Sequence, residues 1–176
     1  MQVAPNTPDY ASKMTIDSIP GASKINTITI RGNGNKIISN LSSIVQFNNA
    51  SYINIDSLQI IGGIGFTGIA IHLGNQSKHI NISNCNIEAG TTSTSSFNAA
   101  IVASGSINSA TVNGNNANNI TIEKNLISGG YYGIIMNGEN SYLNNFGPGD
   151  FSVFPIKLDT SINLIGQYGL QTLPIM

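Results

Sequence analysis

Residues 52–60 read Tyr-Ile-Asn-Ile-Asp-Ser-Leu-Gln-Ile, and residues 79–87 read His-Ile-Asn-Ile-Ser-Asn-Cys-Asn-Ile. Both copies place apolar residues at positions 2, 4, 7 and 9, so a strand-like alternation resumes after one extra residue. The pattern recurs at residues 119–127, and its first half recurs at 27–31. Repeats at this spacing predict stacked units, none of which can bury its apolar face alone.

Alignment of the copies predicts columns of equivalent side chains that face a shared core. Isoleucine suits such columns because identical β-branched neighbours about 4.8 Å apart pack in register. We expect asparagines at the break in the pattern to hydrogen-bond either to backbone groups or to an asparagine of a neighbouring coil. The columns are Ile28/Ile53/Ile80/Ile120, Ile30/Ile55/Ile82/Ile122, Ile60/Ile87/Ile127, Val45/Ile71/Ile101/Ile134 and Phe47/Leu73/Ala103/Met136, with Asn33/Leu58/Cys85/Asn125 at the break.

The composition favours one all-β domain with many polar turns. Charged residues make up 9% of the 176 residues, against about a quarter in ordinary globular proteins. We expect an entry or cap segment at residues 1–24, repeated coils at 25–158, and a weakly patterned C-terminal segment at 159–176. Both ends read as cuts from a longer chain.

Charge and hydropathy exclude several partners and sites. The net charge of -1, with scattered basic residues, predicts no nucleic-acid surface. No apolar run reaches the ~18 residues of a membrane-spanning helix. Cys85 is the single cysteine, which excludes an intrachain disulfide, and its place in the repeat predicts a small core residue rather than a nucleophile.

The repeated units, the strand at residues 133–136 and the Asn-rich turns together resemble the right-handed parallel β-helix of the pectin-lyase-like superfamily. Residues 50–58 and 84–87 resemble coils of large secreted bacterial surface proteins. The resemblance spans residues 25–158 and implies a solenoid of about four to five coils. It also implies a secreted or cell-surface location, and a role as a scaffold or polysaccharide-binding module within a larger protein.

The side chains between the inward isoleucines should form a polar strip on the outer face of the first sheet. An aromatic ring beside many hydrogen-bonding groups suits a polysaccharide or cell-surface glycan. A solvated β-face without any ligand carries the same residue types. The candidate ligand-binding residues are Tyr52, Asn54, His79, Asn81 and Thr121.

The alternative function is a polysaccharide lyase or glycoside hydrolase that acts along the same strip. Its candidate catalytic residues are Asp56, Glu123 and His79, and the two acids should lie two coils apart. Arg31, one coil from Asp56, should pair with it. The resemblance to lyases raises calcium as a cofactor, but no acidic cluster is present to hold it, so we predict no metal site and no cofactor. The short aspartate motifs of the hydrolases are also missing.

Three further expectations come from the columns. His72 lies between two inward residues and should be an outward-facing surface residue. Threonines at 27, 29 and 121 suggest ice binding, but the ladder is interrupted by Tyr52 and by two asparagines. Open solenoid ends expose unpaired strand edges, which favours end-to-end self-association.

Overall fold

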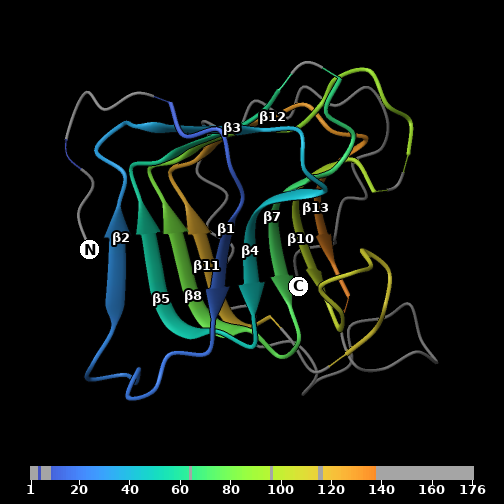
Figure 1. Ribbon diagram of the computed structural model, residues 1–176. Coiled ribbons are helices and arrows are strands. Elements are labelled where there is room, and N and C mark those ends of the chain that lie inside the picture. The colour runs from blue at the N-terminus through green and yellow to red at the C-terminus, as the bar shows by residue number, and fades with distance from the viewer. Residues whose placement is uncertain (1–3, 5–8, 64, 96, 115–116, 138–176) are drawn as a thin grey trace, which may run out of the picture.

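A computed structural model describes residue 4 and residues 9–63, 65–95, 97–114 and 117–137. This part of the chain is all-β, and its strands form three parallel sheets. Figure 1 shows strands from successive passes of the chain lying side by side. The arrangement is compatible with the expected parallel β-helix. The part of the predicted coil region that follows residue 137 and the segment 159–176 lie outside the described residues.

Each complete pass of the chain contributes one strand to each sheet. The first sheet contains β2 (Ile28–Arg31), β5 (Ser51–Asp56), β8 (Lys78–Ser83) and β11 (Asn118–Glu123). The second contains β3 (Lys36–Ser39), β6 (Gln59–Gly62), β9 (Asn86–Glu88) and β12 (Leu126–Ser128). The third contains β1 (Met14–Asp17), β4 (Ser43–Asn48), β7 (Ile69–Gly74), β10 (Ala99–Ser104) and β13 (Tyr132–Met136).

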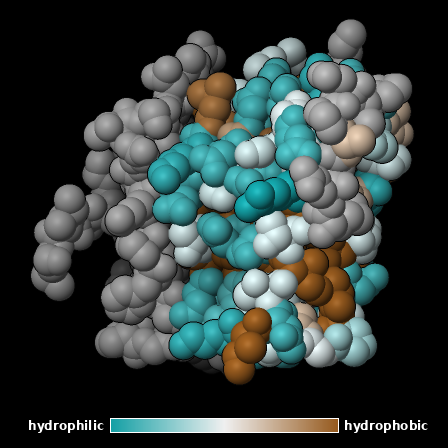
Figure 2. Space-filling model, turned by 90° about the vertical axis from the view of Figure 1, so that its left-hand side faces the viewer, coloured by the Kyte–Doolittle hydropathy of each residue, from teal (hydrophilic) through white to brown (hydrophobic). Residues whose placement is uncertain are grey.

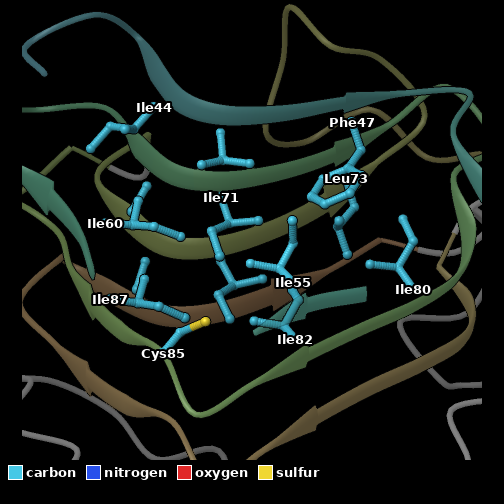
Figure 3. Packing of buried hydrophobic residues seen from close by; sticks show 14 of the residues in the cluster. Ile44, Phe47, Ile55, Ile60, Ile71, Leu73, Ile80, Ile82, Cys85 and Ile87 are labelled. Atoms are coloured by element: carbon cyan, nitrogen blue, oxygen red, sulfur yellow. The ribbon is translucent and has the colours of Figure 1, made fainter. Parts of the chain in front are cut away.

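The strand registers confirm the predicted apolar columns. Ile55 pairs with Ile30 on one side and with Ile82 on the other, and Ile82 pairs with Ile122. On the third sheet, Ile71 lies between Val45 and Ile101. Side chains from all three sheets meet in one core, which Figure 3 shows from close by, and most of them are fully buried. The repeat in the sequence is therefore a repeat in the packing.

One member of a predicted column, Asn33, is misplaced by two residues. The register places Asn35, not Asn33, beside Leu58, because Lys36 pairs with Gln59. Four residues separate β2 from β3, whereas two residues separate the equivalent strands of later passes. Asn35 is buried, and its amide donates to the carbonyl oxygen of Gly32 at 2.7 Å. The longer first turn thus shifts the alignment without changing the chemistry of the position.

Asn125 fills the same column at the other end and confirms that buried asparagines bond to backbone. Its Oδ1 accepts from the Cys85 N–H at 2.8 Å, and its Nδ2 donates to the Ile82 carbonyl oxygen at 2.8 Å. Cys85 itself is buried within the core, as predicted. Asn125 therefore ties the turn between β11 and β12 to the turn between β8 and β9 of the preceding pass.

Replacement of Asn125 by alanine should lower the free energy of unfolding by about 1–3 kcal/mol, because two buried backbone groups lose their partner. Chemical denaturation of the purified domain measures this change. Asn26 is exposed and offers a matched control. A loss for Asn125→Ala no larger than that for Asn26→Ala would contradict the structural role.

The segment before the first repeated coil adds to two of the sheets. Strand β1 pairs in parallel with β4, and Tyr10 bridges to Ile37 of β3. Figure 2 views the side of the molecule that lies at the left of Figure 1, where β2 is found. Polar residues cover most of the described surface there, with separate apolar groups between them. Ile25, just before β2, is 93% exposed.

A long segment after β10 covers part of the outer face of the third sheet. Ala110 of this segment packs with Ile69, Ala99 and Val102 in a second apolar cluster outside the main core. The prediction that His72 is a surface residue is therefore wrong, since its side chain is only 1% exposed. It does point away from the core as expected, but another part of the chain lies over it. In the described part of the chain, no helix is long and apolar enough to cross a membrane.

Candidate functional site

Tyr52 and His79 lie side by side near the starts of β5 and β8, as the alignment of the repeats predicts. Their rings are stacked, with centroids 4.5 Å apart and planes inclined by 6°. Both residues have left-handed backbones, with φ of 60° and 52°, as does Asn119 (57°) in the next pass. This conformation is uncommon outside glycine. Its recurrence at one position gives both rings the same direction and brings them face to face.

The polar row at the middle of the first sheet also has the predicted register. Asn54 pairs with Asn81, and Asn81 pairs with Thr121. The Asn54 amide donates to Oγ1 of Thr29 at 3.2 Å, so part of this row is bonded within the protein. Oδ1 of Asn81 is buried and has no hydrogen-bond partner. The row is a polar ladder whose central amide is only partly satisfied.

The carboxylate of Asp56 forms an ion pair with one neighbouring side chain and accepts a hydrogen bond from another. Its Oδ2 lies 3.7 Å from Nε of Arg31, which confirms the predicted pair, and its Oδ1 accepts from Asn84 Nδ2 at 2.8 Å. Ser83 lies between Asp56 and Glu123 in the strand register. Two strand spacings place the backbones of the two acids about 10 Å apart. The structure therefore keeps these candidates on one face but does not bring them into direct contact.

One titratable group on β8 and one in the turn that follows it are shifted toward their neutral forms. Burial, with a smaller effect from the charge of Lys78, lowers the pKa of His79. Burial raises the pKa of the Cys85 thiol to about 11, so the thiolate is scarce at neutral pH. His79 is thus an uncharged ring suited to stacking, and Cys85 is an inert core residue.

A polar groove adjoins these strands at the turns that lead into β5 and β8, and sequence reasoning missed it. Its volume is about 540 Å³, and its lining includes Asp17, Asn48, Asn49, Asn75 and Gln76. Asn75 Nδ2 donates to Asn48 Oδ1 at 2.8 Å, and Asn48 Nδ2 donates to Asp17 Oδ1 at 2.7 Å. The available signal was the 27-residue offset between the turns at Asn48 and Asn75, which repeats their polar residues as well as their shape.

The described residues offer no group of three or more His, Cys, Asp or Glu side chains that could hold a metal ion. The acids on the first sheet are instead paired with an arginine or separated by a serine. The arrangement can stack a ring and hydrogen-bond to a polar ligand. No known family model, curated protein or solved structure matches this chain.

Proposed function

We propose that the chain is a right-handed parallel β-helix module of a secreted or cell-surface protein, and that it binds polysaccharide without cleaving it. The binding surface combines the turn groove with the outer face of the first sheet. The observation that carries this proposal is the stacked Tyr52–His79 pair. Each ring follows, by three residues, an amide side chain that lines the groove. Sugar rings present both apolar C–H faces and hydroxyl groups, which match aromatic rings and amides respectively.

The repeat of polar and aromatic groups supports a proposed ligand that runs across the strands. Tyr52 follows Asn49 by three residues, and His79 follows Gln76 by three residues, so two successive passes present the same polar and aromatic sequence. Strand spacing separates equivalent groups by about 4.8 Å. A glycan that runs across the strands can therefore meet similar groups on successive passes. Extended chains suit such a surface better than single sugars do.

Binding is tested on a glycan array with the purified domain, with and without a calcium chelator. Tyr52→Ala should weaken binding about tenfold, since an aromatic contact contributes ~0.5–1.5 kcal/mol and the stack is lost with it. Tyr10→Ala, which removes an exposed ring distant in sequence, is the matched control and should bind normally. Chelation should leave binding unchanged.

Two results would change the proposal. Silence of the unmodified domain across a broad array would leave a structural scaffold as the function and overturn polysaccharide binding. Release of shortened chains from a bound glycan would favour the enzyme alternative, and Asp56→Asn and Glu123→Gln would then show whether the candidate acids carry it. Normal cleavage by both variants would exclude that assignment.

A further inference from the structure

The dipeptide Asn-Gly occurs three times in the chain, at residues 33–34, 113–114 and 137–138. This dipeptide favours deamidation, because glycine has no side chain to obstruct the approach of its backbone nitrogen to the asparagine side chain. The reaction requires that the glycine nitrogen is free to move and that the asparagine Cγ is free to turn toward it. The reactive groups are the same in all three copies, so the fold decides which copy reacts.

The fold restrains the copy at residues 33–34 through the glycine nitrogen. The Gly34 N–H donates to the Ser57 carbonyl oxygen at 2.7 Å. Asn33 and Gly34 both have left-handed backbones, with φ of 51° and 77°, in the turn between β2 and β3. Attack by the Gly34 nitrogen requires this hydrogen bond to break and the turn to open. We therefore expect slow deamidation of Asn33 in the folded chain.

The fold restrains the copy at residues 137–138 through the asparagine side chain. Nδ2 of Asn137 donates to the carbonyl oxygens of Ala103 and Ala110, at 3.2 Å and 2.5 Å. The Asn137 N–H also donates to the Ala103 carbonyl oxygen at 2.9 Å. These bonds fix the plane of the side-chain amide, so its Cγ cannot turn freely toward the next residue. Gly138 itself lies outside the described residues.

Neither restraint acts on the copy at residues 113–114, in the segment between β10 and β11. Asn113 is exposed, and neither its side-chain amide nor the Gly114 N–H forms a hydrogen bond with any described residue. The backbone just before this pair is anchored, because the Gly105 N–H donates to the Val112 carbonyl oxygen at 2.7 Å. A side chain at Gly105 would collide with the Asn113 carbonyl oxygen. These contacts hold the backbone but leave both reactive groups free.

From this contrast we infer that Asn113 is a site of spontaneous deamidation in the folded chain. The Gly114 nitrogen attacks Cγ of Asn113 and forms the N–Cγ bond of a cyclic imide. The side-chain nitrogen leaves Cγ as ammonia and takes the proton from the attacking nitrogen. Water then cleaves either carbon–nitrogen bond of the imide, which gives aspartate or isoaspartate. Water is the only co-reactant, and the inference does not depend on polysaccharide binding.

The product changes the charge and the backbone of this segment. Residues 104–118 contain no Asp, Glu, Lys, Arg or His, so the new carboxylate is the first charge there, in a chain whose net charge is -1. Isoaspartate also adds a methylene group to the backbone. The Ala117 N–H donates to the Ser77 carbonyl oxygen at 2.8 Å, so the reactive pair lies between two anchored positions. We expect the three sheets to stay intact.

Peptide mapping by mass spectrometry follows all three asparagines in one sample of the domain, incubated in mildly alkaline buffer. In the folded chain, Asn113 should deamidate at least about tenfold faster than Asn33 or Asn137, because only those two need local opening first. In concentrated urea this protection is lost, and the three rates should agree within about threefold. The unfolded sample thus shows whether the fold causes the difference.

Two variants identify the product without peptide mapping. Asn113→Gln should remove the acidic species that accumulates on ion-exchange chromatography, whereas Asn33→Gln should leave its rate of formation unchanged. Circular dichroism of the aged domain should retain the β signal of the fresh one. Equal rates at the three asparagines in the folded chain, or faster deamidation of Asn33 or Asn137, would overturn the inference. Deamidation of Asn113 that occurs only in urea would also overturn it.

Discussion

Replacement of Ile82 by alanine should lower the free energy of unfolding by about 2–5 kcal/mol. Ile82 is fully buried and lies in the middle of a column, between Ile55 and Ile122. Figure 3 shows it among side chains from other strands of the core. The substitution removes three carbon atoms from a packed site and leaves a cavity that rigid parallel strands cannot close. Guanidinium or urea denaturation at neutral pH measures the loss.

Ile25 provides the matched control, because the same substitution at a side chain that is 93% exposed removes little buried surface. We expect Ile25→Ala to change the unfolding free energy by less than about 0.5 kcal/mol. If Ile82→Ala were as mild as Ile25→Ala, the column would not be packed as described. The comparison also tests whether equivalent isoleucines in successive passes share one core.

Acid should destabilise the fold through His72. The pKa of this residue is about 4 in the folded chain, against 6.5 for an unperturbed histidine, because burial and Lys13 disfavour the charged ring. Between these values the unfolded chain binds a proton that the folded chain does not. Stability therefore falls as the pH falls from 6.5 to 4, by about 3 kcal/mol in total, and this contribution levels off below pH 4.

Urea denaturation at a series of pH values measures this slope, and His72→Gln separates it from other titrations. The glutamine variant keeps a polar group but cannot titrate, so its stability should vary less between pH 4 and pH 6.5. His79 contributes a smaller change of the same sign, since its pKa is lowered as well. Identical pH profiles for the variant and the original chain would show that His72 is not buried in its neutral form.

The core could be predicted from sequence because it follows the repeat. A column such as Ile53 and Ile80 needs only the offset between copies and the alternation of a strand. The stack of Tyr52 and His79 follows from the same offset. Asn33 was misplaced because the first turn has two more residues than its equivalents, and the repeat gives no information about a turn of different length.

The surroundings of His72 could not be predicted in this way. Its direction follows from the alternation of β7, but its burial depends on a segment that begins some thirty residues later and has no counterpart in earlier passes. Contacts between a repeated strand and a segment that is not repeated produce no periodic pattern in the sequence. The groove at the turns was missed for a different reason, because polar turn residues were interpreted only as turns. In both places the polar chemistry lies outside the regular columns.

The segment that covers His72 lengthens one pass of the chain. The entropy cost of closing this longer connection is small. Ile53 and Ile80 are 27 residues apart, whereas Ile80 and its partner Ile120 are 40 apart. Closure entropy grows only with the logarithm of loop length, so the longer connection costs roughly 0.3 kcal/mol more. That amount is small beside the burial of one apolar side chain, ~1.5–3 kcal/mol. A solenoid can therefore lengthen one pass, gain a cover over one face and leave the spacing of its strands unchanged.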